Sequence, residues 1–240
     1  MMEHTGAKQG KVRKGMRLAG KGGFTLVELL VALAISGVVL GAVYSAYSSH
    51  QKTYITLSEV SNMEQNLRAA MYYMQTEIRM AGCNPLGTAD VGIKTASSTE
   101  IRVKADITGG ESDGVDNDND GNTDEADEAI YSDGDANDAN EDVTYKLDSG
   151  ALKRNNIILA ENVDALNFVY LDGSGNTTTD LSEIRSVQIT LVARVAHEDR
   201  NYTDTQVYTN QQGTTIYGPA NDHYRRRILS AQVRCRNLGL

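Results

Sequence analysis

The sequence contains few of the residues that most often build catalytic centres. Among 240 residues there are four histidines and two cysteines. The histidines are scattered, and none lies in a metal-spaced pair or beside a cysteine or serine nucleophile; they are His4, His50, His197 and His223. No glycine-rich loop of the kind that cradles phosphate groups is present. These absences indicate that the chain is not an enzyme.

Proline is equally scarce, with two residues in the whole chain. None interrupts the sequence between Phe24 and Asn84, and the first strong stop signal is Pro85, shortly after Gly82. We therefore expect one helical element over residues 24–82, roughly 85 Å long at the usual helical rise. Its second half carries an apolar stripe with helical spacing, made of Val60, Met63, Leu67, Met71, Met74 and Ile78. This stripe predicts a helix face that docks a folded domain.

A basic leader and an apolar run stand at the start of the chain. Residues 1–23 carry six lysines and arginines and a single acid. From Phe24 to Val43 the chain is almost wholly apolar, so that residues 24–45 are long enough to span a membrane. The pair Gly22-Gly23 precedes this run, whereas a secretory signal places its small residues after it. Cleavage at the pair would remove the leader and leave the apolar helix on the mature chain.

This junction carries a family resemblance. The string Gly22-Gly23-Phe24-Thr25-Leu26-Val27-Glu28 resembles the class III signal of type IV prepilins and pseudopilins. The resemblance implies that a prepilin peptidase cuts between Gly23 and Phe24 and methylates the new amino terminus of Phe24. The segment 77–82 resembles the end of the N-terminal helix in PilW-type minor pilins, and segments 160–163 and 184–187 resemble strand starts of that group. The layout is also similar to that of J-type pseudopilins of type II secretion.

Glu28 is the only charged residue of the apolar run, and it lies about one helical turn after Phe24. A carboxylate in lipid costs about 2–3 kcal/mol and is usually functional or paired. The resemblance implies that Glu28 pairs with the terminal amine of a neighbouring subunit during filament assembly. A carboxylate without a partner at the headgroup boundary is the alternative. Gly37 and Gly41 form a GxxxG pair, which predicts close packing against another helix.

Residues 83–240 show a different pattern, in which apolar and polar residues alternate. Alternation favours strands, and it is clearest at 101–103, 143–147, 163–171, 184–195 and 227–236. We expect an antiparallel sheet packed on the helix, which makes an α+β protein with a pilin-like layout and one β-rich head domain.

An acidic insertion over residues 111–142 contains fourteen acids and no lysine or arginine. Its core places Asp116, Asp118 and Asp120 at alternate positions, followed by Gly121. Calcium takes six to eight oxygen ligands, and closely spaced carboxylates in a turning backbone supply them. The predicted ligands of this first loop are Asp116, Asp118, Asp120, Asn122, Asp124 and Asp127.

The first loop departs from an EF-hand, because Asp127 takes the place of the bidentate glutamate and no helices flank the loop. It resembles instead the Asp-rich repeats of extracellular calcium modules. A second and weaker candidate set is Asp133, Asp135, Asn137 and Glu141. The alternative for both sets is a solvated acidic loop, since runs of like charge are often disordered.

The two cysteines, Cys83 and Cys235, lie at the end of the predicted helix and in the last predicted strand. An exported protein meets an oxidising compartment, where a disulfide persists. We therefore predict a disulfide between them, which would close a long loop and stabilise the fold by about 5 kcal/mol in the loop-entropy estimate. Two buried free thiols are the alternative.

The resemblance, together with these patterns, implies a minor pilin of a type IV pilus that acts in a priming or tip complex. The expected partners are the prepilin peptidase, other minor and major pilins and the inner-membrane assembly platform. The expected location is the inner membrane, crossed once with the head in the periplasm, and later the pilus at the cell surface. The alternatives are a J-type pseudopilin of type II secretion and a calcium-dependent adhesin.

Nucleic acid is not an expected partner. A cluster of arginines near the C-terminus could form a small basic patch, at Arg225, Arg226, Arg227, Arg234 and Arg236. Against this, the chain from Phe24 onward has 17 basic and 31 acidic residues, which gives a net charge of 17 − 31 = −14. Such a charge opposes nonspecific binding to DNA.

Overall fold

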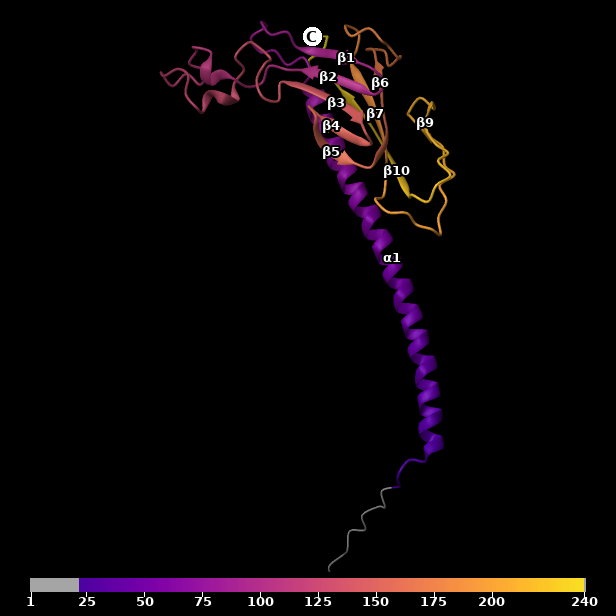
Figure 1. The fold of residues 1–240 in the computed structure, drawn as a ribbon. Coiled ribbons are helices and arrows are strands. Elements are labelled where there is room, and N and C mark those ends of the chain that lie inside the picture. The colour runs from indigo at the N-terminus through magenta and orange to yellow at the C-terminus, as the bar shows by residue number, and fades with distance from the viewer. Residues whose placement is uncertain (1–21, 240) are drawn as a thin grey trace, which may run out of the picture. The chain divides into compact units, whose positions relative to one another are not determined.

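The computed structural model describes residues 22–239 (Figure 1). All of the predicted leader except Gly22 and Gly23 therefore lies outside the described residues. The chain falls into two compact units, one ending at Lys52 and the other beginning at Thr53. Each unit is described below by itself.

One helix, α1 (Leu26–Met80), begins in the first unit and ends in the second. Among the described residues it is the one helix long and apolar enough to cross a membrane. Its most apolar window of 18 residues has a mean hydropathy of 2.5, and none of that window is buried. Exposed leucine and valine side chains along the first unit are what a lipid-facing or helix-facing segment requires.

Gly82 ends α1 by leaving the helical conformation, with a φ of 81°. Its N–H donates to the carbonyl of Lys104 at 3.0 Å, and the N–H of Cys83 donates to the carbonyl of Met80 at 2.9 Å. A Cβ at Gly82 would lie 2.5 Å from the Leu238 side chain. The left-handed backbone is the reason that glycine is favoured here. Pro85 lies beyond the end that the glycine sets.

The second unit contains a five-stranded antiparallel sheet with its strands in chain order. The strands are β1 (Gly92–Ala96), β2 (Glu100–Lys104), β3 (Asp142–Asp148), β4 (Ala151–Arg154) and β5 (Ile157–Glu161). The strands β2 and β3 are hydrogen-bonded neighbours, with Lys104 opposite Asp142. The acidic segment therefore leaves the sheet after β2 and returns directly beside its point of departure (Figure 1).

A three-stranded antiparallel sheet has the order β10-β7-β6. Its strands are β6 (Val163–Leu171), β7 (Ser186–Arg194) and β10 (Arg226–Arg234). Between β7 and β10 the chain forms a small hairpin of β8 (Tyr208–Thr209) and β9 (Thr215–Tyr217). Two short 3-10 turns, η1 (Gly110–Ser112) and η2 (Glu128–Ile130), lie in the acidic segment.

One hydrophobic core joins the C-terminal half of α1 to both larger sheets. The helix contributes a buried face made of Met63, Leu67, Ala70, Met71, Met74 and Ile78. The predicted stripe therefore faces the core, with Val60 partly buried at its edge. Burial of such side chains contributes about 1.5–3 kcal/mol each. The predicted fold class, an α+β protein with a long helix and antiparallel sheets, is confirmed.

Candidate functional sites at the helix start and in the acidic segment

The predicted cleavage point lies in the short non-helical segment directly before α1. Gly22 and Gly23 are exposed, and an added Cβ at either would meet no other described atom within 4 Å. Phe24 is 91% exposed. A peptidase can bind an extended segment of this kind, because neither folded structure nor side chains cover it.

Glu28 forms a capping box with Thr25 at the start of α1. The Glu28 N–H donates to Thr25 Oγ1 at 3.2 Å, and the Thr25 N–H donates to Glu28 Oε2 at 2.9 Å. The Thr25 hydroxyl also donates to Oε2 at 2.9 Å. Two backbone N–H groups without helical partners are satisfied in this way. The Thr-x-x-Glu spacing of a capping box was present in the sequence, but the prediction for Glu28 considered its charge alone.

Gly37 and Gly41 lie on the exposed part of α1. An added Cβ at either position would meet no other described atom within 4 Å, apart from the helix's own backbone. The helix surface is therefore bare and open at both glycines, as close approach by a second helix requires.

The first acidic loop brings together Asp116, Asp118 and Asp120. Each offers a carboxylate oxygen, and these oxygens lie within 4.8 Å of one another. The loop is shaped by its own backbone, since the Gly121 N–H donates to Asp116 at 2.9 Å. Desolvation, and then the charges of Asp120, Asp127 and Asp116, raise the pKa of Asp118. Three carboxylates at this separation can share one cation.

The remaining predicted ligands of the first loop are arranged differently. Asp124 accepts a hydrogen bond from the Gly114 N–H at 2.7 Å and lies outside the group of three. Asp127 also lies outside that group, although its charge acts on Asp118. The Asn122 side chain donates to Asp120 at 3.1 Å through its amide nitrogen.

Glu128, one position after Asp127, is a buried residue that the sequence analysis did not single out. It is fully buried, and its oxygens accept hydrogen bonds from the backbone N–H groups of Asn117 and Glu125, the latter at 3.1 Å. A carboxylate that ties two backbone positions fixes the ends of a loop. Glu128 therefore closes the first acidic loop from inside. Acidity alone could not distinguish it from its thirteen acidic neighbours.

The second acidic loop brings together Asp133, Asp135 and Asp138, again with oxygens within 4.8 Å of one another. This differs from the predicted set. Glu141 is 1% exposed, and its oxygens accept the N–H groups of Ile107 at 2.7 Å and of Asp138 at 3.2 Å. Glu141 thus holds the backbone, and Asp138 takes its place in the carboxylate group. Asn137 donates its backbone N–H to Asp135 at 2.8 Å.

The predicted disulfide is not formed, because Cys83 and Cys235 are both free thiols in the structure. Cys235 packs into the hydrophobic core at the end of β10, and burial raises the pKa of its thiol to about 11. Burial, and then the charge of Asp106, also raise the pKa of Cys83. Neither thiol is therefore activated as a thiolate.

Three of the five arginines in the cluster, Arg225, Arg226 and Arg227, form ion pairs within the second unit. Arg226 is buried and contacts Asp164 at 2.7 Å, Asp204 at 3.0 Å and Asp222 at 2.6 Å. Arg225 pairs with Asp199 at 2.8 Å and Arg227 with Glu64 at 3.0 Å. These guanidinium groups stabilise the fold through ion pairs. The alternating pattern of the last strand did not predict that Arg226 is buried.

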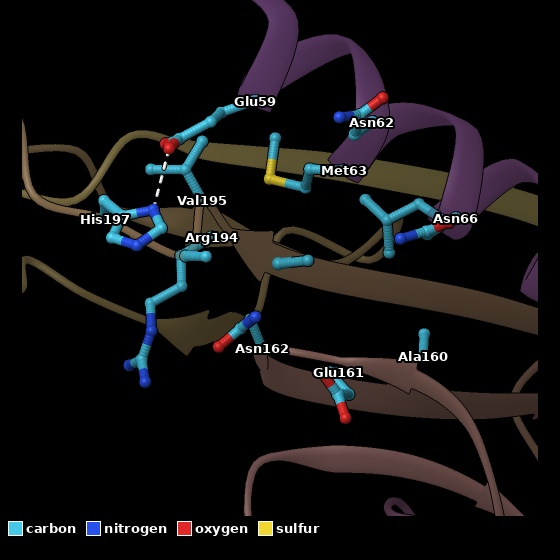
Figure 2. Close-up of a pocket in the computed structure, with 13 residues that line it drawn as sticks. Glu59, Asn62, Met63, Asn66, Ala160, Glu161, Asn162, Arg194, Val195 and His197 are labelled. Carbon is cyan, nitrogen blue, oxygen red and sulfur yellow. Dashed lines mark hydrogen bonds and ion pairs between the residues drawn. The ribbon is translucent and has the colours of Figure 1, made fainter. Parts of the chain in front are cut away.

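A groove of about 210 Å³ lies between α1 and the ends of β5 and β7 in the second unit (Figure 2). Its lining includes Met63, Asn66 and Asn162. At its rim His197 Nδ1 makes a hydrogen bond with Glu59 at 2.7 Å, as the dashed line in Figure 2 marks. The histidine side chain is 80% exposed. The groove is part of the junction between α1 and the sheets.

Comparison with known proteins places the chain among pilus proteins. Residues 18–44 match the family model described as the prokaryotic N-terminal methylation motif. Residues 114–237, just over half of the chain, match the model described as Type IV Pilus-assembly protein W. Among curated proteins there is no match. A solved type IV-like pilin from Thermus thermophilus is similar at 14% identity and a TM-score of 0.48, over 75% of this chain and 100% of that one. On the family match, the chain belongs to the PilW family of type IV pilus-assembly proteins.

Proposed function

We propose that this protein is a minor pilin that takes part in assembling a type IV pilus, within a priming or tip complex. The main support is the exposed segment at Gly22-Gly23-Phe24, which lies directly before α1. The most apolar stretch of 18 residues in α1 is not buried. The methylation motif covers the same residues. A helix of this kind requires lipid or other helices around it, because exposed apolar side chains are costly in water.

Processing at the junction is the first step of the proposal. A prepilin peptidase would cut between Gly23 and Phe24 and methylate Phe24, while the precursor crosses the inner membrane once with its head in the periplasm. The mature helix would then pack with other pilin helices through the surface at Gly37 and Gly41. Mass analysis of the N-terminus of native protein, copurified with other pilins in mild detergent, tests this step. A native chain that begins before Gly23 would contradict it.

Glu28 would have two roles in the mature chain. It caps α1 through Oε2, and its charge would pair with the terminal amine of a neighbouring subunit as that subunit docks. The two roles can be separated by substitution. Glu28→Gln keeps an acceptor for the Thr25 N–H and removes the charge. Thr25→Val removes the hydroxyl that caps the helix and keeps the charge.

Pilus number per cell then decides between the two roles of Glu28. We expect Glu28→Gln to abolish or strongly reduce piliation, because an amide cannot replace an ionic pair in a low-dielectric filament core. Thr25→Val should leave most pili in place, since losing a cap costs about 1 kcal/mol. Membrane levels of each variant are the control. The reverse order of effects would contradict the charge role.

We also propose that the first acidic loop binds calcium through Asp116, Asp118 and Asp120, with Asn122, Asp124 and Asp127 as further candidates. The support is the convergence of three carboxylates in a loop closed by Glu128. Calorimetry of the full processed chain in detergent, with millimolar calcium, tests the proposal. Heat of binding should fall in the double variant Asp116→Asn/Asp118→Asn. It should be unchanged in Glu183→Gln, which alters an exposed acid between β6 and β7.

A further inference from the structure

Two exposed tyrosines mark the end of the apolar part of α1. Tyr44 follows directly on the apolar run that ends at Val43, and Tyr47 lies three positions later. The five residues after Tyr47 are all polar, and they end at Lys52, where the first unit ends. Tyr44 is 73% exposed and Tyr47 is 62% exposed. The two rings therefore lie at a sharp boundary between apolar and polar helix surface.

Tyrosine has the chemistry that such a boundary in a membrane requires. Its ring is apolar, whereas its hydroxyl group forms hydrogen bonds. Tyrosines therefore gather where the hydrocarbon of a bilayer meets the lipid headgroups. An exposed pair at this point of an apolar helix matches that environment.

The spacing between Glu28 and Tyr47 matches the thickness of a bilayer. The two residues lie 47 − 28 = 19 positions apart on one helix, and residues 29–46 between them carry no charge. At the usual helical rise this spacing is about 29 Å. The hydrocarbon core of a bilayer is about 30 Å thick. When an upright helix places Tyr47 at the headgroups of one leaflet, Glu28 therefore lies at the headgroups of the other.

Lipid fits the surface at Tyr47 better than a second helix does. Helices in membranes approach each other through small residues, which α1 offers at Gly37 and Gly41. At 3.6 residues per turn, Tyr47 projects roughly 80–120° away from these two glycines around the helix axis. A second helix packed on the glycines would therefore leave Tyr47 facing lipid.

We infer that Tyr44 and Tyr47 bind the lipid headgroup region of the periplasmic leaflet and set the depth of α1 in the membrane. The inference rests on the proposed membrane-spanning helix and adds the residues that fix its position. Both tyrosines are positioning residues for Glu28, because they hold its carboxylate at the opposite headgroup boundary. There the carboxylate stays hydrated and avoids the cost of a charge in hydrocarbon until it meets the amine of a neighbouring subunit.

The experiment uses the absence of tryptophan from the chain, because one introduced tryptophan then reports its own depth. The full chain is reconstituted in phosphatidylcholine vesicles with bromine on the acyl chains, either near the headgroup or near the bilayer centre. Tyr47→Trp keeps an interfacial aromatic residue, so bromine near the headgroup should quench its fluorescence most. A second reporter, Leu33→Trp, replaces an exposed residue five positions after Glu28 and should lie about 8 Å inside the opposite boundary.

Removal of both rings tests whether they set this depth. In Tyr44→Ala/Tyr47→Ala the helix can slide by up to about 6 Å, or four positions, before its polar residues reach the boundary. The Leu33→Trp reporter then moves toward the headgroups. Its quenching by bromine near the headgroup should rise, and its quenching by bromine at the centre should fall. The control Tyr72→Ala/Tyr73→Ala removes two exposed tyrosines of the second unit and should leave the reporter unchanged.

The outcomes separate the tyrosine inference from the pilin proposal. An unchanged depth of Leu33→Trp in Tyr44→Ala/Tyr47→Ala would overturn the inference and leave the spanning helix in place. Strongest quenching of Tyr47→Trp by bromine at the bilayer centre would also overturn it. So would loss of that quenching as protein density in the vesicles rises, because the tyrosine would then contact another helix. If neither lipid quenches Leu33→Trp, the spanning helix itself is contradicted, and the inference with it.

Discussion

At the scale of single residues, buried charges organise the head. Arg226 has no exposed side-chain surface and contacts three carboxylates. It also lies over the ring of Tyr217, with its guanidinium carbon 5.1 Å from the ring centroid. Its partners come from β6, from the chain before β8 and from the turn before β10. One guanidinium therefore holds together segments that hydrogen bonds between strands do not join.

The first prediction concerns Arg226. Arg226→Ala should lower the free energy of unfolding of the head by about 3–5 kcal/mol, because it leaves buried carboxylates without a counter-charge. Arg225→Ala, which removes a more exposed pair with Asp199, should cost at most about 1 kcal/mol. Urea unfolding of both variants, followed by circular dichroism, measures the difference. Equal losses in the two variants would show that burial of Arg226 is not the cause.

The second prediction concerns Asp222, whose pKa the hydrogen-bonded Arg226 guanidinium holds below the usual range. A carboxyl with a lowered pKa stabilises the fold above its unfolded pKa, and this contribution is lost as pH falls through the folded pKa. The difference in free energy of unfolding between wild type and Asp222→Asn should therefore be full at pH 6 and shrink below about pH 4. Urea unfolding at several pH values measures it. A difference that grows toward acid would contradict the assignment.

At the scale of elements, α1 changes its environment along its length. Before Lys52 its apolar side chains are exposed, and after Met63 one face is buried in the core. The same helical periodicity serves both parts, but only the second has a sheet to pack against. Glu77 also links α1 to β3 and β4, since it accepts hydrogen bonds from the Tyr145 hydroxyl and from Arg154 Nε, the latter at 2.9 Å.

The third prediction concerns the buried face of α1. Met74→Ala should lower the free energy of unfolding by about 2–5 kcal/mol, because it leaves a cavity at a fully buried position. Tyr72→Ala, at a position 67% exposed on the same turn, should change it by about 0.5 kcal/mol or less. Urea unfolding decides between them. Similar losses would mean that Tyr72 contributes to the core as well.

At the scale of the whole molecule, the acidic segment is an insertion between two strands, β2 and β3, that pair with each other directly. The pairing of β2 with β3 runs to Lys104 and Asp142, so the segment begins and ends at adjacent positions. Long connections of this kind are usually functional. Replacing residues 107–140 with a short glycine-containing turn should therefore leave the sheet intact.

The fourth prediction concerns that replacement. The shortened chain should keep the circular dichroism spectrum of its strands, lose calcium binding and still reach the membrane. If the segment acts in contacts between minor pilins, piliation falls. If piliation is kept and adhesion is lost, the segment acts as a calcium-dependent adhesin. Counting pili and measuring adhesion in one strain, with Glu183→Gln as the control, separates the two outcomes.

Local patterns were enough for α1 and for five of the ten strands described, whereas β1, β4, β5, β8 and β9 were not predicted. The apolar run, the scarcity of proline and the helical stripe predicted α1, and alternation predicted β6, β7 and β10 to within a few residues. The sequence also indicated the junction before Phe24 and the alternate spacing of Asp116, Asp118 and Asp120, because the residues of each pattern are close together in the chain. The family resemblance rests on the same short-range strings.

The tertiary structure decided which polar groups are buried. Four charged residues of types that usually lie on the surface are buried, namely Asp106, Glu128, Glu141 and Arg226. Glu128 and Arg226 have hydrogen-bond partners that lie 11 and 62 positions away in the chain. The tertiary structure also placed Cys235 in the hydrophobic core as a free thiol. Burial of a charge depends on what the rest of the chain folds around it. A periodic pattern records which face of one element is apolar, and it carries no information on which distant groups share that face.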